Sequence, residues 1–425
     1  MSVPRLIANR ITCPPPSPPP GGPHTRPPVN LLCYLFLLAG LTLLFSGWSP
    51  GSSMAQDAGF LTDRPVLYNV STSFLGSTSD TPFWHYTNTS GQIRSGSSVN
   101  NLTSLAVAMP FREQHDGIDF SAGAELASRL SDTGNTIHFQ QLYGSLQLGV
   151  FRLSIGRFYQ TIGMTMQELS TGSMMQSRNA TPVPKISIDM TRFVDVPRTN
   201  GIVQFKGHYS DGKLESDRFV DSPFIHQKSF YLKFNIERME AIGGFVHNVT
   251  WGGTDPNIGR LPQGFSDYLR VVIGKGARDD SNVPTQGQIT NKIGNTVAAY
   301  DLALRYHFNN FHLIGYRMIY LEDTVSLLLR SFWDGMYGLG YRRTDGSRSL
   351  FSGVLYEYMD TIRQDSQGNY PRGRANYYGH SVYRSGWTFN GNVLGNPLLT
   401  FDRESGRMVN NMIIAHHLGF DGWLN

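Results

Sequence analysis

Apolar and polar side chains alternate with a period of two residues along much of the chain from about Ser104 onward. Successive side chains of a β-strand point to opposite faces, so a segment with this period has one apolar and one polar face. The segment 118–130 carries Ile118, Phe120, Ala122, Ala124 and Leu126 on one face and Asp119, Ser121, Gly123, Glu125 and Arg129 on the other. The segments 203–209, 230–237 and 297–308 repeat the pattern. We therefore expect an all-β chain whose strands separate water from an apolar medium.

That medium is predicted to be a membrane. The apolar faces carry almost no charge, as lipid requires when a basic side chain at mid-membrane costs about 2 to 4 kcal/mol, and Tyr and Phe recur near the segment ends, as in interfacial girdles. A soluble sandwich also alternates, and the apolar run 327–329 fits the pattern less well. After Gln56 no apolar stretch is long enough for a membrane-spanning helix, so a membrane location would require a β-barrel. We favour a transmembrane antiparallel β-barrel over the sandwich.

The predicted connections differ in length. Short turns are expected at 132–134, 210–212 and 345–347, where Asp, Gly, Ser and Thr cluster, whereas 160–199, 252–295 and 363–396 read as long excursions. A barrel with tight periplasmic turns and long outer loops has this inequality.

The first 55 residues are typical of an export leader. Residues 1–30 are rich in proline and are expected to be disordered, and residues 31–55 resemble a signal peptide that is cleaved near Ala55 and Gln56. The n-region is unusually long, so either translation starts elsewhere or the leader is atypical; an uncleaved membrane anchor is the weaker alternative. Both cysteines, Cys13 and Cys33, lie in the leader, so the exported chain is expected to lack disulfides. The predicted location is the outer membrane of a Gram-negative bacterium.

Residues 56–102 are predicted to form a periplasmic N-terminal segment with a short helix, and residues 103–425 the barrel. Asp80 is a suitable N-cap, Pro82 is allowed in the first turn, and Gly91 follows the expected C-terminal end. Phe83 and Trp84 would be the buried face of a plug or lid element. A short surface helix is the alternative.

One stretch, 376–397, combines five aromatic residues with four glycines: Tyr377, Tyr378, Tyr383, Trp387 and Phe389, with Gly379, Gly386, Gly391 and Gly395. Glycine weakens a helix and clustered exposed aromatics are costly in water, so this stretch suits a loop folded onto a binding surface. Sugars, with flat apolar faces and hydroxyl rims, would fit such a surface. The alternative is a loop that packs its aromatic side chains on the scaffold.

Charged residues of both signs are predicted on the polar faces of the strands, among them Arg317 and Glu357, which we expect to line the lumen. Cross-strand ion pairs explain such residues without a ligand; a glycan track is the functional alternative, because guanidinium groups pair bidentately with acidic sugars. The net charge of +4 is spread along the chain, which does not favour a nucleic-acid partner.

Catalytic signatures are weak. A glycosidase needs two carboxylates facing a cleft, and the chain offers Glu322, Asp323, Asp334, Glu357 and Asp360, but carboxylates in this number are ordinary. His416 and His417 are adjacent, so on a strand they point to opposite faces and do not share a metal ion. There is no nucleophile elbow, zinc-protease helix or phosphate loop. We expect no enzyme activity, no cofactor and no metal.

Several separated motifs together resemble the Wzi capsule assembly proteins in their Bacteroidetes form. These motifs are 81–84, 214–228, 245–253, 332–335 and 376–397, and the resemblance covers most of residues 74 to 420. It implies an outer-membrane barrel of about eighteen strands that binds capsular polysaccharide as a lectin and is not an enzyme, with the N-terminal helix as a periplasmic plug. The resemblance also leads us to expect strands beyond Asn425 and an aromatic last residue, so either the gene is read short or the barrel is left open.

The predicted function is to bind capsular or other surface polysaccharide and anchor it at the cell surface, with outer-membrane lipid and possible capsule export machinery as further partners. The proposed ligand contacts are Arg317, Trp333, Glu357, Tyr377, Tyr378, Arg384 and Trp387. A diffusion porin is the first alternative function, and a secreted carbohydrate-active hydrolase is the second.

Overall fold

The structure is a computed structural model that describes residues 64–112, 117–275, 294–322, 329, 331–364 and 375–424. The predicted leader, signal peptide and cleavage site lie outside these residues, as do Asp323 and residues 327–328. The described residues belong to one compact unit, Arg64–Asn425. No helix among them is long and apolar enough to cross a membrane.

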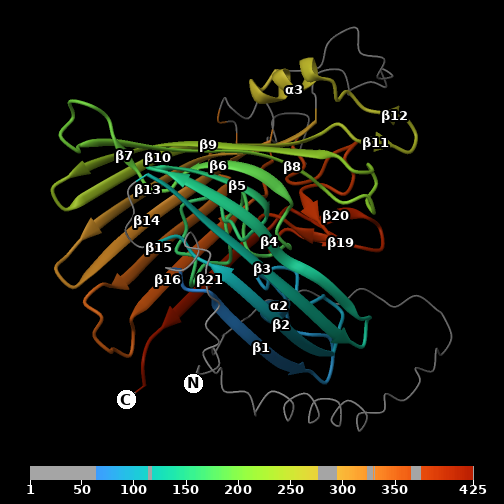
Figure 1. The fold of residues 1–425 in the computed structure, drawn as a ribbon, viewed down its shortest axis with the longest axis horizontal. Helices are drawn as coiled ribbons and strands as arrows, with labels where there is room; N and C mark the ends of the chain where they lie inside the picture. Colours follow the sequence, from blue (N-terminus) through green and yellow to red (C-terminus); the bar gives the residue numbers. More distant parts are fainter. Residues whose placement is uncertain are drawn as a thin grey trace, which may run out of the picture. The chain divides into compact units, whose positions relative to one another are not determined.

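The described residues are organised around one large antiparallel sheet (Figure 1). Its strands are β1 (Leu67–Gly76), β2 (Val99–Met109), β3 (Ile118–Ser131), β4 (Thr136–Leu148), β5 (Phe151–Arg157), β6 (Lys185–Met190), β7 (Val194–Asp195), β8 (Val203–Lys213), β9 (Phe224–Ile236), β10 (Met239–Trp251), β13 (Asn295–His307), β14 (Phe311–Leu321), β15 (Gly335–Arg343), β16 (Gly353–Asp360) and β21 (Ile414–Asp421). Short two-stranded sheets are formed by β11 (Thr254–Asp255) with β12 (Gly259–Arg260), β17 (Thr388–Phe389) with β18 (Asn392–Val393), and β19 (Thr400–Asp402) with β20 (Arg407–Asn410). The helices are α2 (Phe83–Tyr86) and α3 (Phe265–Val272).

Neighbouring strands of the large sheet follow one another along the chain, with β7 beside β8 and with β21 paired to β16 after a long connection. The expected fold class, all-β with a large antiparallel sheet, is confirmed. Within the described residues, β1 pairs with β2 and β21 pairs with β16, and these two end strands are not paired with each other. The predicted boundary at residue 103 moves, because the sheet begins at Leu67, inside the segment expected to be periplasmic.

The two faces of the sheet differ as the alternation predicts. In β13, Asp301 and Ala303 are buried while Leu302 and Leu304 are exposed, and in β9 Tyr231 is buried beside the exposed Phe230. The inner face is the polar and mixed one, and the outer face exposes large apolar side chains along most of its strands, such as Leu339, which is 64 % exposed. This is the distribution that a lipid-facing sheet requires.

The antiparallel register places the connections alternately at two edges. At one edge, which we call the long-loop edge, lie the strand ends that are joined by the connections 77–98, 132–135, 158–184, 214–223, 252–294, 322–334 and 361–413. The short-turn edge holds 110–117, 149–150, 191–202, 237–238, 308–310 and 344–352. The predicted inequality of loop lengths is therefore present. The turn predicted at 210–212 is wrong, because these residues continue β8 and the chain reverses only after Lys213.

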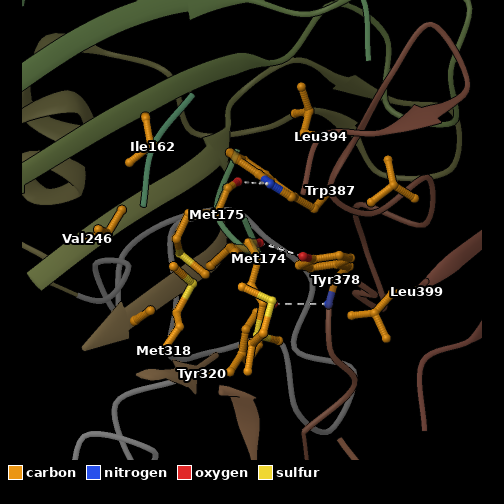
Figure 2. Close-up of a cluster of buried hydrophobic side chains, with 14 of the residues drawn as sticks. Ile162, Met174, Met175, Val246, Met318, Tyr320, Tyr378, Trp387, Leu394 and Leu399 are labelled. Carbon is orange, nitrogen blue, oxygen red and sulfur yellow. Dashed lines mark hydrogen bonds between the residues drawn. The ribbon is translucent and has the colours of Figure 1, made fainter. Parts of the chain in front are cut away.

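Two connections of the long-loop edge fold against the inner face and build the main core. Leu169, Met174 and Met175 from 158–184 and Trp387 and Phe389 from 361–413 are fully buried there. Figure 2 shows Met174, Met175 and Trp387 in the same cluster as inner-face residues of the sheet, among them Val246 and Met318. The inner side of the sheet is thus occupied by packed loops.

The short helix forms close to its predicted place, with Pro82 as N-cap residue and Asp80 outside it. The ring of Trp84 lies 5.2 Å from that of His417 in β21. Asn88 donates to the carbonyl of Thr171 at 2.7 Å. The connection between the first two strands therefore contacts both the last strand and the inward-folded loop.

Candidate ligand-binding site

The aromatic stretch 376–397 is held by its own rings. Trp387 donates its indole N–H to the carbonyl of Met175 at 2.8 Å, and the Tyr378 hydroxyl donates to the carbonyl of Met174 (Figure 2). That hydroxyl also accepts from the backbone N–H of Asn396 at 2.9 Å. Every polar atom of these two side chains is thereby satisfied inside the protein, as buried polar groups require.

Tyr377 is anchored in the same way. Its hydroxyl donates to Asp334 at 2.8 Å, and the backbone N–H of Gln364 donates to the same carboxylate at 2.7 Å. Burial raises the pKa of Asp334, although these hydrogen bonds oppose the shift. Burial and the neighbouring Asp334 charge likewise raise the pKa of Tyr377 well above its usual value. Asp334 is thus a carboxylate that fixes two loops to each other.

Tyr377, Tyr378 and Trp387 are each 1 % exposed or less, so in this conformation their rings present no surface to a ligand. The geometry gives them the packing role that was the alternative expectation. As ligand contacts they stay predictions.

Glycine is needed where this stretch folds tightly. Gly386 has φ of +64°, and a Cβ there would lie 2.3 Å from the carbonyl oxygen of Tyr378. A Cβ on Gly395 would lie 2.1 Å from the Tyr378 hydroxyl. A side chain at Gly395 would displace the ring of Tyr378, and one at Gly386 would displace the backbone of Tyr378.

Glu357 points inward, as predicted. Its carboxylate accepts from the Ser170 hydroxyl at 2.6 Å, the Thr171 backbone N–H at 2.7 Å and the Tyr316 hydroxyl at 2.5 Å. It therefore ties the loop 158–184 to β14 and β16. Glu322 similarly accepts from the backbone N–H of Asn376 at 2.6 Å.

The prediction that Arg317 lines the lumen is wrong. Its neighbours Tyr316 and Met318 are buried in the main core, so the alternation of β14 turns Arg317 to the outer face. There its guanidinium lies 4.0 Å from the ring centroid of Phe332 and 5.6 Å from that of Trp333. Trp333, which is 60 % exposed, therefore joins Arg317 on the outside, apart from the stretch 376–397.

A cavity of about 870 Å³, which we call the vestibule, opens among the connections of the long-loop edge. Arg384, Ser385 and Thr388 line it on one side, so the predicted stretch does contribute to a cavity, through its polar residues and not through its buried rings. The other lining residues are Gly91, Arg94, Arg129, Thr136, Ile137, His138, Arg157, Thr181, Glu215, Asp217, Arg218, Phe219, Asn390, Gly391, Asn392, Phe401, Arg403, Glu404, Ser405, Gly406 and Arg407.

Two connections form a shared wall of the vestibule. Arg218 donates to the carbonyls of Thr388 at 2.9 Å and Gly386 at 3.0 Å, and lies 3.4 Å from Glu215. Burial lowers the pKa of Arg218 and raises that of Glu215, and the attraction between the two charges opposes both shifts. Arg218 is therefore an ion-paired cation that joins the two connections within the wall.

Arg384 occupies a different position on that wall. Its guanidinium lies 4.3 Å from the ring centroid of Phe219, and the backbone N–H of Phe219 donates to Ser385 at 3.1 Å. Stacking on a ring leaves the edges of a guanidinium group able to donate to a ligand. Of the predicted contacts, Arg384 is the one that lines the vestibule.

A second cavity, of about 650 Å³, lies on the inner face among other residues, including Arg152, Asp189, Lys206, His208 and Arg305. Neither cavity contains a group of three or more His, Cys, Asp or Glu arranged for a metal ion, and none occurs elsewhere in the part of the chain that the structure describes. The arginines of the vestibule come from separate connections and strands. Sequence spacing gave no signal that Arg94, Arg403 and Arg407 would meet.

An antiparallel sheet of consecutive strands, with an apolar outer face and loops folded against its inner face, defines a protein of the β-barrel class. Within that class the chain belongs to the Wzi capsule assembly family, because the family model described as capsule assembly protein Wzi matches residues 72–408.

Solved structures similar to the chain include Wzi of Escherichia coli, described as an outer membrane protein involved in group 1 capsule assembly and a carbohydrate-binding β-barrel. It is 16 % identical, with a TM-score of 0.47, over 78 % of this chain and 63 % of the Wzi chain. The present chain thus spans less than two thirds of that protein.

Two porins are also similar. A mutant porin of Rh. blastica is 11 % identical over 70 % of this chain and 94 % of its own, with a TM-score of 0.27. OmpF of Salmonella typhi in complex with daunomycin is 7 % identical over 74 % and 94 %, with a TM-score of 0.29. No curated protein matches the chain.

Proposed function

We propose that the chain is an outer-membrane protein that binds capsular or other surface polysaccharide non-covalently in the vestibule and thereby anchors capsule to the cell. Membership of the capsule assembly family supports the role in capsule assembly. The vestibule is the observation that carries the binding role. Its volume of about 870 Å³ falls within the range of roughly 300 to 1,000 Å³ that small-molecule sites occupy.

The lining of the vestibule suits a sugar chain. Hydroxyl and amide groups of Ser385, Thr388, Asn390 and Asn392 lie there together with guanidinium groups. Such groups hydrogen-bond to sugar hydroxyls, and no covalent step is needed to hold a polymer at several points.

The orientation follows from loop length. In outer-membrane barrels the long loops face outward and the short turns face the periplasm, so the vestibule would open to the cell exterior. The helix α2 belongs to the same long-loop edge. This places it on the outer side in our proposal, in place of the periplasmic plug that the resemblance implied.

The roles of the proposed contacts divide accordingly. Arg384 contacts the polysaccharide, whereas Tyr377, Tyr378, Trp387 and Glu357 hold the loops that shape the vestibule. Arg317 and Trp333 face the membrane lipid at the outer face. Contact with capsule export machinery stays a prediction, and we propose no catalytic role for the chain.

Replacing Arg384 with alanine should weaken polysaccharide binding by about tenfold, the typical loss for one charged hydrogen-bonding group of about 1.5 kcal/mol. On cells, polysaccharide should move from the cell-bound to the released fraction while the total stays constant. Cell-bound and released polysaccharide would be measured in a strain that carries the variant as its sole copy.

The matched control is Arg348→Ala. Arg348 lies in the connection 344–352 of the short-turn edge, and its guanidinium lies over the ring of Trp423. This variant should retain polysaccharide as the unmodified protein does. Unchanged retention in the Arg384→Ala strain, at equal surface levels of protein, would show that the vestibule does not anchor capsule.

A further inference from the structure

Arg129 is a buried cation with little to neutralise it. The residue lines the vestibule, yet it is only 4 % exposed. Its Nη1 reaches the carbonyl of Gln92 at the long distance of 3.5 Å, and its Nε and Nη2 have no hydrogen-bond partner. A buried charge without a partner is costly, because the water it has lost is not replaced.

The nearest charges further destabilise the positive charge of Arg129. Arg94 and Arg403 both repel Arg129 electrostatically. Burial and the charge of Arg94 also lower the pKa of Arg403, with Glu215 opposing the shift. Arg403 donates to the carbonyl of Asn390 and the side chain of Asn392, each at 3.1 Å, and both acceptors are neutral. Three arginines from three separate segments thus repel one another, and the acceptors of Arg129 and Arg403 are neutral.

The carboxylates of the vestibule compensate this group only in part, through the attraction of Glu215 for Arg403. Glu215 is paired with Arg218 in the wall. Asp217 and Glu404 also line the vestibule, but within the described residues neither forms an ion pair with Arg94, Arg129 or Arg403. Like charges gathered in a cleft without counter-charges raise the local concentration of an anionic ligand.

We propose that the vestibule selects an acidic polysaccharide, and that the carboxylate of a uronic-acid-type sugar is bound by Arg129 and Arg403 with Arg94 beside them. The planar guanidinium group presents paired N–H donors that match the two oxygens of a carboxylate. Such a ligand would supply the negative charge that the buried Arg129 lacks among its neighbours. The inference rests on the proposed function and adds the chemical class of its ligand.

The test uses the full chain, purified in detergent, and surface polysaccharide isolated from the bacterium that encodes it. One portion of the polysaccharide is left native, and in a second portion the uronic carboxylates are reduced to primary alcohols, which preserves the linkages. Binding of both portions is measured at low and high salt. The native polymer should bind at least about tenfold more tightly, and the difference should shrink as salt screens the charges.

Variants locate the effect. Arg403→Gln changes a side chain of the hairpin β19–β20 that is no part of the main core, so it tests the charge without disturbing that core. Arg129→Gln and Arg129→Lys form a pair in which the second keeps the charge. Arg403→Gln and Arg129→Gln should each weaken binding of the native polymer by about tenfold or more and leave the reduced polymer almost unaffected. The matched control Arg152→Gln removes a guanidinium from the second cavity and should change neither.

The outcomes separate the two proposals. Equal binding of native and reduced polymer overturns the selection for acidic sugars and leaves polysaccharide binding intact. Binding that survives carboxyl reduction but is lost with Arg403→Gln would identify a phosphate or sulfate substituent and also overturns the carboxylate assignment. Failure of the unmodified chain to bind either polymer overturns the proposed function itself.

Discussion

Tyr378 is fixed from both sides of its hydroxyl group, which donates to Met174 and accepts from Asn396. The residue also has a φ of +65°, which is uncommon for a side chain larger than glycine. Backbone strain of this kind persists where the surroundings determine the conformation. Tyr378 therefore holds the stretch 376–397 in place.

Replacing Tyr378 with phenylalanine keeps the ring and removes the hydroxyl. Because a buried N–H and a buried carbonyl then lose their partner, the free energy of unfolding should fall by about 1 to 3 kcal/mol. The measurement is denaturant unfolding of the purified protein, followed by tryptophan fluorescence.

Tyr356→Phe is the matched control for that experiment. Tyr356 is 44 % exposed on the outer face and its hydroxyl contacts His416. Its loss should change the free energy of unfolding by about 0.5 kcal/mol or less. Equal effects of the two changes would mean that the Tyr378 hydroxyl does not fasten the loop.

Single residues also show where sequence reasoning fails. The alternation in β14 was recognisable from the sequence, but which of its two faces points inward was not. Tyr316 and Met318 suit a lipid-facing surface as well as a core. Since inward-folded loops supply an apolar core, the polar residue between them faces outward. For Glu357 the same reasoning gave the right face, because its flanking tyrosines do face outward.

At the scale of strands, inner-face rings lie over glycines of the neighbouring strand. A Cβ on Gly338 in β15 would lie 2.0 Å from the ring of Tyr316 in β14, and a Cβ on Gly244 in β10 would lie 2.1 Å from that of Tyr231 in β9. Tyr316 donates to Glu357, and Tyr231 donates to Asp301 at 2.9 Å. The glycines thus let a ring lie flat across the sheet and reach a buried carboxylate.

Gly338→Ala should lower the free energy of unfolding by about 1 to 3 kcal/mol, because the added methyl group displaces the Tyr316 ring. Gly315→Ala in β14, where a Cβ meets nothing within 4 Å, is the control and should be nearly neutral. Denaturant unfolding measures both.

A second variant background tests whether the effect of Gly338→Ala comes from its contact with Tyr316. In a Tyr316→Ala protein, Gly338→Ala should cost much less, since the ring it would displace is gone. An undiminished cost there would show that the alanine acts on the backbone of β15 and not on the ring.

The strands themselves were largely predictable, because period-two alternation depends only on local sequence. The segment 118–130 lies in one observed strand, and 230–237 and 297–308 each extend one residue past the end of theirs. The turn at 210–212 was misplaced because Asp and Gly also occur within β8. Turn composition alone does not determine where pairing ends; the partner strand β9 continues the ladder past these residues.

At the scale of the whole described unit, packed loops occupy the inner face of the sheet. These loops contribute Leu169, Met175 and Trp387, whose side chains are fully buried in the main core. An open diffusion channel needs a water-filled path along the inner face, so this packing disfavours the porin alternative.

The purified protein in a planar lipid bilayer should therefore show no steady conductance of the size that an open porin gives under the same conditions. An open general porin in the same bilayer is the positive control. Stable conductance steps of porin size from the purified chain would contradict the packed inner face and would favour the porin function.

The candidate site was only partly predictable because it is built from residues that lie far apart in the sequence. The stretch 376–397 was recognisable by composition, yet which of its residues face a cavity depends on loops about 200 residues away. Arg129, Arg94 and Arg403 belong to three segments whose proximity comes from the completed sheet. Local sequence carries no information on such a meeting.

The contacts that join these distant loops bear on the order of folding. Strands of the sheet pair mostly with their neighbours in sequence, whereas Trp387 bonds to Met175 across 212 residues and Asn396 to Thr171 across 225. Contacts over such separations close large loops and form slowly. We expect the sheet to assemble before the vestibule does, so that a nascent, half-inserted chain cannot yet capture polysaccharide and ligand binding begins only when folding ends.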